Sequence, residues 1–340
     1  MIPKSPMERI LEVADQNDLV TYALAQYLNR TPRLLSDGTV ERFARECELD
    51  TDEAFRVLFC AACGLDTADN RLHRLLEREY FITGLHALEP NEYVNNPYYQ
   101  TIHIREQKQG RWELRESCYE PYEPFVCGHL QVTREFREIA QIGYFKERFT
   151  FPAVLEDGIE WMTITPNEIE TMKEPVAKAH GRVLTLGLGL GYYAFMVSEK
   201  DDVESITVVE KDDEVISLFC KIILPQFPNK EKVRIVRADA FDYLKKDAKK
   251  ECFDYVFADL WHDQSDGLPL YLRLRKLEKE LPDAQFSYWI EPTILSSLRH
   301  MVIDKITDKN SPIKLVDISP TELLSDDYLK KLAPQLKNFE

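Results

Sequence analysis

The 340-residue sequence has no excess of positive charge, because 59 Asp and Glu outnumber 43 Lys and Arg and leave a net charge of -16. Nucleic-acid binding depends on clustered cations that neutralise phosphates, so this composition argues against a nucleic-acid partner and favours a small, cationic substrate. No apolar run approaches the ~20 residues of a membrane span. Acidic residues also stand among the first twenty positions, where a secretory signal is apolar. We expect no membrane partner and a cytoplasmic location.

The sequence also lacks a second cysteine pair at zinc-binding spacing. Seven cysteines are an odd number, which fits reduced thiols better than a disulfide framework. Cys60 and Cys63 form a single CxxC inside an apolar, helix-like run. We expect buried helix thiols there rather than a zinc or redox centre, and we predict no metal site.

Three regions differ in their apolar patterns. Residues 1–88 show apolar positions at intervals of three and four, which predicts a helical domain. Two of these helices, over 40–49 and 51–64, have the outline of a helix-turn-helix, but Arg56 is the single basic residue of the second one. DNA reading needs more cationic donors on that helix. We expect this domain to dock onto a catalytic unit or to form the contact of a homodimer.

Residues 89–165 favour a small β-rich region. The segments 98–104 and 111–117 alternate in the manner of strands, with a turn at Gln109-Gly110 between them. A second turn is predicted at Asp157-Gly158, between two extended segments within 148–164.

Residues 166–340 alternate apolar strands with helices, which predicts an α/β domain with a Rossmann-like, mostly parallel sheet covered on both faces. One further strand is expected over 313–319. The five main strands are expected over 182–188, 205–210, 233–239, 253–261 and 286–291.

A glycine turn follows the first of these strands. Gly187, Gly189 and Gly191 allow positive φ and a close approach of the backbone to a ligand. An acid that ends the next strand, Glu210, can accept hydrogen bonds from a ribose diol. Tyr192 occupies the position where a nicotinamide fingerprint needs its third glycine, so we expect another kind of nucleotide ligand.

The pattern Thr185-x-Gly187-x-Gly189-x-Gly191 resembles the first motif of the class I S-adenosylmethionine-dependent methyltransferases, which often carry an acid where this chain has Thr185. The resemblance implies S-adenosylmethionine as cofactor, held by Thr185, the three glycines and Glu210. It implies that Asp239 and Ala240 bind the adenine side and that Asp259 faces the reacting group. Asp239 could instead cap the following helix.

The sequence is also similar to the spermidine synthases, which transfer aminopropyl groups from decarboxylated S-adenosylmethionine. The similarity lies in a β-rich region before the glycine motif, a related segment over 156–172, and an acid like Asp259 that serves as base. Two departures are Leu190, where that family has an acid, and the sequence DLWHD over 259–263, where it has Asp-Ser-Ser-Asp.

Asp259 and His262 are the predicted catalytic residues, while Trp261 and Tyr192 are predicted to contact the substrate or to pack around it. We expect a methyltransferase that acts on an unidentified small molecule. Aminopropyl transfer is the first alternative, and a cofactor-binding regulator without catalysis is the second.

Overall fold

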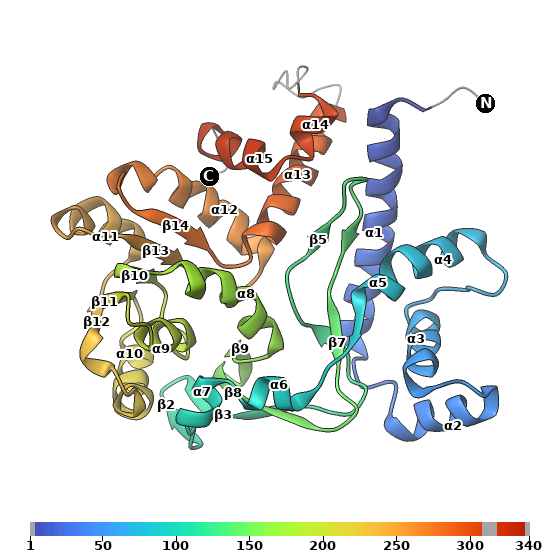
Figure 1. Ribbon diagram of the computed structural model, residues 1–340, viewed down its shortest axis with the longest axis horizontal. Coiled ribbons are helices and arrows are strands. Elements are labelled where there is room, and N and C mark those ends of the chain that lie inside the picture. The colour runs from blue at the N-terminus through green and yellow to red at the C-terminus, as the bar shows by residue number, and fades with distance from the viewer. Residues whose placement is uncertain (1–3, 308–317, 337–340) are drawn as a thin grey trace. The chain divides into compact units, whose positions relative to one another are not determined.

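The computed structural model describes residues 4–307 and 318–336 (Figure 1). The described residues of 1–90, 118–150 and 298–328 form one compact unit, and those of 91–117, 151–297 and 329–340 form a second. The chain therefore passes several times from one unit to the other.

Unit 1 begins with the expected helical region. Its helices are α1 (Pro6–Arg30), α2 (Asp37–Cys47), α3 (Thr51–Ala62), α4 (Arg71–Leu76) and α5 (Ile82–Gly84), with a π-helical turn over Glu77–Phe81. Asp50 caps α3 as its Oδ1 accepts hydrogen bonds from the backbone of Asp52 and Glu53. All seven cysteines are free. Burial raises the pKa of Cys60, and it raises that of Cys63 to about 12, so both thiols stay protonated at neutral pH.

Short strands pack against these helices. One sheet has the order β1 (Leu85–Ala87), β7 (Ile142–Tyr144), β4 (Phe125–Val126), and β5 (Gln131–Val132) pairs with β6 (Glu138–Ile139). Phe55 of α3 stacks on Phe59 and lies 4.2 Å from the ring of Tyr144 in β7. Residues 118–150 belong to this unit because their apolar side chains complete the core of the helices.

Unit 2 is built on a five-stranded, fully parallel sheet of the expected Rossmann-like type (Figure 1). Its strand order is β12-β11-β10-β13-β14. Successive strands are added on one side of β10 up to β12 and on the other side from β13 onward, so the strand order switches at β10. In open α/β sheets ligands bind at such a point, outside the carboxyl ends of the strands. The strands are β10 (Gly181–Leu186), β11 (Val203–Glu210), β12 (Val233–Arg237), β13 (Tyr255–Ala258) and β14 (Gln285–Tyr288).

Helices connect these strands as the sequence predicts. They are α8 (Pro166–Lys178) before β10, then α9 (Tyr192–Ser198), α10 (Asp213–Leu218), α11 (Ala240–Lys246) and α12 (Gln264–Arg275). After α10 the chain continues through a π-helical turn, Phe219–Ile223, and a 3-10 turn, Leu224–Gln226. The helix α13 (Glu291–Thr307) follows β14, and α14 (Pro320–Leu323) and α15 (Asp326–Leu332) come after it.

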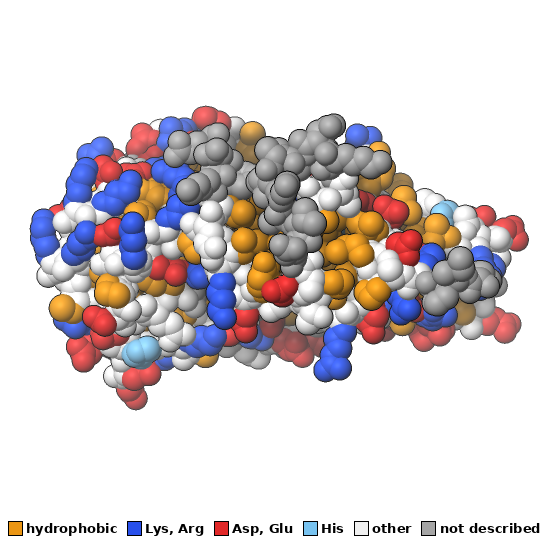
Figure 2. Space-filling model, turned by 90° about the horizontal axis from the view of Figure 1, so that it is seen from above, with side chains coloured by type: hydrophobic (Ala, Val, Ile, Leu, Met, Phe, Trp, Pro, Cys, Tyr) orange, Lys and Arg blue, Asp and Glu red, His pale blue; other side chains and the backbone are white. Residues whose placement is uncertain are grey.

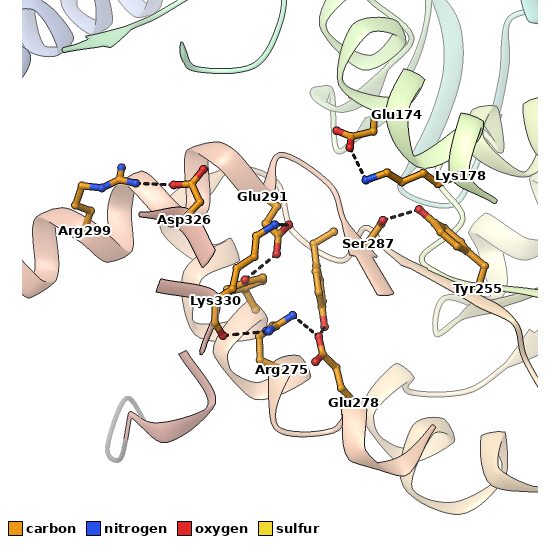
Figure 3. Close-up of polar contacts among 12 residues, drawn as sticks. Glu174, Lys178, Tyr255, Arg275, Glu278, Ser287, Glu291, Arg299, Asp326 and Lys330 are labelled. Carbon is orange, nitrogen blue, oxygen red and sulfur yellow. Dashed lines mark hydrogen bonds and ion pairs between the residues drawn. The ribbon is translucent and has the colours of Figure 1, made fainter. Parts of the chain in front are cut away.

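Polar contacts join β13 to β14 and join α15 to the helices before and after β14 (Figure 3). The Tyr255 hydroxyl donates to Ser287 Oγ at 2.5 Å, joining β13 to β14. Lys330 in α15 forms an ion pair with Glu291 at 2.7 Å, and its carbonyl accepts from Arg275 of α12.

A four-stranded sheet lies within 107–163, in part of the region expected to be β-rich. Its order is β2 (Gln107–Gln109), β3 (Trp112–Tyr119), β8 (Phe149–Glu156) and β9 (Ile159–Thr163). The turn between β8 and β9 places Asp157 at φ 51° and Gly158 at φ 85°, the positive angles that a tight hairpin turn requires.

The expected strand over 98–104 is wrong, because α7 (Pro97–Thr101) occupies that segment after α6 (Pro90–Val94). Asn96 caps α7 by accepting from the Tyr98 backbone, and Pro97 at the first helical position suits a helix start. The strand expected over 313–319 lies, apart from its last two residues, outside the described part of the chain.

Within the described residues no helix is long and apolar enough to cross a membrane. Figure 2 shows one face of the molecule, on which Lys and Arg side chains are interspersed with acidic ones. Some oppositely charged side chains pair along the chain, since Lys246 pairs with Asp242 and Lys250 with Asp247.

Candidate functional site at the carboxyl edge of the parallel sheet

The glycine turn after β10 lies against the end of β13. Gly187 has φ 102°, and a Cβ there would collide with the carbonyl oxygen of Asp259. Gly189 has φ 51°, and a Cβ there would collide with Met162 Sδ. The sulfur of Met162 also accepts a hydrogen bond from the Leu190 backbone at 3.3 Å. Backbone contact therefore excludes a side chain at Gly187, while Gly189 is favoured by its positive φ. Gly191 follows as the residue before α9.

Glu210 joins the end of β11 to this turn. Its Oε2 accepts from the Leu188 backbone at 3.3 Å, and its Oε1 accepts from the backbones of Lys211 and Asp212 at 2.7 and 2.9 Å. The structure thus places this carboxylate beside the glycine turn, where a ribose bound at the turn would meet it. Whether it holds a ribose stays a prediction.

Asp259 follows β13, and its backbone N–H donates to the Leu186 carbonyl at 2.9 Å. The side chain is half-buried. Burial, and then the negative charge of Glu210, raise the pKa of Asp259 to about 7. A carboxyl group with this pKa exchanges a proton readily near neutral pH, which is what a general base requires.

Glu168 is a site residue that the sequence analysis missed. It lies in the first turn of α8 and is 8% exposed. Burial, and then the charge of Asp259, raise its pKa well above the usual range. Its Oε2 has no hydrogen-bond partner among the described residues. One acid near the start of a helix carries no sequence signal of this kind, since most such acids stabilise the helix from the surface.

Asp239 and Ala240 lie at the start of α11. Asp239 is exposed, and its Oδ1 accepts from the Asp242 backbone at 3.0 Å, so it serves as the helix cap. Ala240 is buried at 6% exposure. The capping role is observed, and the additional contact with adenine stays a prediction.

Thr185 and Tyr192 are both buried. The Thr185 hydroxyl donates to the carbonyl of Gly187 at 3.4 Å, so it supports the turn from within. The Tyr192 hydroxyl accepts from Asn96 Nδ2 at 2.9 Å, and its ring packs near Tyr98. Tyr98 in turn donates to the Leu190 carbonyl at 2.7 Å. Packing is therefore the observed role of Tyr192.

Trp261 and His262 point to different environments. Trp261 is 6% exposed and stacks on Tyr288, with no hydrogen-bond partner for its Nε1 within the described ranges. His262 is exposed, and its ring stacks on Trp161 at 5.7 Å. Its backbone N–H donates to the Asp266 carboxylate, which belongs to the capping box of α12.

In the part of the chain that the structure describes, no three His, Cys, Asp or Glu side chains converge as they would around a metal ion. The arrangement is instead a glycine turn at the strand-order reversal, with Glu210 and Asp259 at the ends of the neighbouring strands and Glu168 of α8 close enough to Asp259 for the charge of one to raise the pKa of the other. The fold defines an α/β domain of the Rossmann-like class.

One protein-family model matches part of this α/β domain. A model of the spermine/spermidine synthase domain matches residues 163–275. The matched segment is less than half of the chain and contains α8, the glycine turn, Glu210, Asp239 and Asp259. No match was found among curated protein sequences.

Two solved spermidine synthases also align with the chain. That of Thermotoga maritima has 19% identity over 43% of this chain and 57% of its own, with a TM-score of 0.30. A spermidine synthase in complex with the transition state analogue AdoDATO has 18% identity over 54% of this chain and 59% of its own, also with a TM-score of 0.30. The chain thus spans less than two thirds of either protein.

The family match corrects one expectation. It supports the expected superfamily, the transferases whose fold resembles the class I S-adenosylmethionine-dependent methyltransferases. The expected methyl transfer is wrong, because the matched model describes the spermine/spermidine synthase domain. The expectation of S-adenosylmethionine as the donor depended on methyl transfer and is withdrawn with it.

Proposed function

We propose that this protein transfers an aminopropyl group from decarboxylated S-adenosylmethionine to an amine acceptor. The observation that carries the proposal is the domain match over 163–275, which includes every strand end that borders the glycine turn. The net charge of -16 and the carboxylates around the turn suit cationic substrates.

In the proposed reaction the acceptor nitrogen uses its lone pair to form a bond to the aminopropyl carbon next to the sulfonium. The carbon–sulfur bond breaks, and its electron pair stays on sulfur, which leaves 5′-methylthioadenosine. Asp259 takes the proton that the acceptor nitrogen must lose, since its pKa of about 7 makes it a base near neutral pH. Glu210 binds the ribose, and the glycine turn admits the adenosyl group close to the backbone.

The experiment supplies the purified protein with decarboxylated S-adenosylmethionine and a panel of amines: 1,3-diaminopropane, 1,4-diaminobutane and longer polyamines. We expect methylthioadenosine and an acceptor that is longer by one aminopropyl unit, in equal amounts by mass spectrometry. A parallel reaction contains S-adenosylmethionine. Release of S-adenosylhomocysteine there, with no methylthioadenosine in the first reaction, would contradict aminopropyl transfer.

A further inference from the structure

Glu168 is an acid of unit 2 with a buried oxygen atom that is unpaired within the described residues. It is 8% exposed, and this atom is its Oε2. The pKa of Glu168 is raised well above the usual range because the charged form costs free energy in this buried place. Thr171 on the same helix, by contrast, is matched with a donor, Trp289 Nε1. The cost is offset when a ligand supplies the missing donor.

Contacts of α8 place Glu168 near the end of β13. Thr171 lies three residues further along α8, on the same side of the helix, and its Oγ1 accepts from Trp289 Nε1 at 3.0 Å. The backbone N–H of Trp289 donates to the carbonyl of Ala258 at 2.9 Å. Asp259 is the next residue, so the first turns of α8 reach the place where the predicted base stands.

The ionisable groups at this place are all acids, and their raised pKa values mean that their charged forms lack a stabilising cation, which a bound ammonium group would supply. The carboxylate of Asp259 acts on Glu168, and the carboxylate of Glu210 acts on Asp259. Neither Glu168 nor Asp259 has a Lys, Arg or His partner among the residues described. Such a group attracts a cation and repels an anion.

We propose that Glu168, together with Asp259, binds the primary ammonium group of an amine substrate, either that of the donor or that of the acceptor. This inference rests on the proposed function. Leu190 stands where spermidine synthases have an acid in the glycine run, and Glu168 supplies a carboxylate at the same edge from a different element. The acids also select against S-adenosylmethionine, since its carboxylate would be repelled.

Binding is measured by titration calorimetry at pH 8 and fixed ionic strength. The ligands are decarboxylated S-adenosylmethionine, S-adenosylmethionine and methylthioadenosine, which lacks the ammonium group. In a further titration 1,4-diaminobutane is added to protein saturated with methylthioadenosine. The variants are Glu168→Gln and, as matched control, Glu174→Gln on the same helix, whose side chain is 68% exposed and pairs with Lys178 (Figure 3).

Loss of a charge-assisted hydrogen bond should weaken binding about tenfold or more. If Glu168 holds the donor's ammonium, Glu168→Gln weakens binding of the decarboxylated donor by this factor and leaves methylthioadenosine unchanged. If Glu168 holds the acceptor's ammonium, Glu168→Gln instead weakens the binding of 1,4-diaminobutane to the protein saturated with methylthioadenosine. Glu174→Gln should match the wild type with every ligand.

Equal affinities of wild type and Glu168→Gln for donor and diamine would overturn the inference and leave the proposed function standing. Should the variant fail to fold, the affinities of the wild type test the inference. It is overturned if decarboxylated S-adenosylmethionine binds no more tightly than methylthioadenosine and the diamine does not bind. Absence of binding by all three adenosyl ligands would overturn the proposed function and this inference together.

Discussion

The backbone carbonyl of Asp259 lies so close to Gly187 that any side chain at this glycine would collide with it. The end of β13 and the turn after β10 are therefore in direct contact, and the base proposed for the reaction is held against the loop proposed to hold the adenosyl group. This contact makes the geometry of the site sensitive to a single methyl group.

Gly187→Ala should destabilise the protein by about 2 kcal/mol or more, because the added Cβ meets the Asp259 carbonyl and the residue has φ 102°. Chemical denaturation measures the change in the free energy of unfolding. Gly38→Ala is the control, since a Cβ there has open space and alanine favours a helix. A loss no larger than that of the control would contradict the close approach.

Glu210→Ala should weaken binding of methylthioadenosine about tenfold or more, because a carboxylate that accepts from a ribose contributes a charge-assisted hydrogen bond. Calorimetry measures the affinity. Glu204→Ala on the same strand is the matched control, because that side chain is exposed. Unchanged affinity in Glu210→Ala would exclude the ribose contact.

Asp259→Asn should lower aminopropyl transfer about a hundredfold or more, since the amide cannot accept the proton. Wild-type activity should rise with pH through about 7, as Asp259 loses its own proton. A pH–rate profile of both proteins checks this prediction. Equal rates above pH 8 would exclude Asp259 as the base.

The same variant makes a prediction about stability. The pKa of Asp259 is about 7 when folded and about 4 when unfolded, so the folded state binds more protons between these values. Its contribution therefore lowers stability as pH rises from 4 to 7. Asp259→Asn should be more stable than the wild type above pH 7, by about 1 kcal/mol or more. Denaturation curves at pH 5 and pH 8 measure the free energy of unfolding of both proteins. If the variant and the wild type differ by the same amount at both pH values, the raised pKa is contradicted.

Thr171→Val should cost about 1–3 kcal/mol, because Trp289 Nε1 loses its acceptor in a buried place. Urea denaturation measures the cost, and Thr150→Val at an exposed position is the control, expected to lie within about 0.5 kcal/mol of the wild type. Donor affinity should fall as well, since this hydrogen bond positions the helix that carries Glu168. Full stability in Thr171→Val would show that the bond is not needed to hold α8.

In unit 1, His300 pairs with Glu138 at 2.7 Å. Burial lowers the pKa of His300, but the hydrogen bond and charge of Glu138, with Asp18 and Asp304 nearby, raise it more, so the net shift is upward. The stability from this pair is complete below pH 6.5 and is lost as pH rises through the folded pKa. His300→Gln should therefore cost about 1 kcal/mol more at pH 6 than at pH 9. A cost independent of pH would contradict the pairing.

Much of the α/β region could be predicted from residue order alone. Strands buried on both faces appear as short apolar runs, and the glycine turn with Glu210 and Asp259 follows from where those runs end. Segment 98–104 was misjudged because alternation suggested a strand, whereas the cap at Asn96 and Pro97 favours a helix. The helix-start signals at these two residues outweighed the alternation of apolar and polar residues, which was short.

By itself the sequence determined the parallel sheet and the carboxylates at its edge, because the periods of strands and helices are local properties of the chain. Tertiary structure alone decided that Glu168 is buried close to Asp259, with an Oε2 that has no partner among the described residues, and that residues 118–150 complete the core of the helices. These facts depend on packing between segments far apart in the chain. The burial and neighbouring charges that shift the pKa of an acid arise from that packing, and no pattern of neighbouring residues records them.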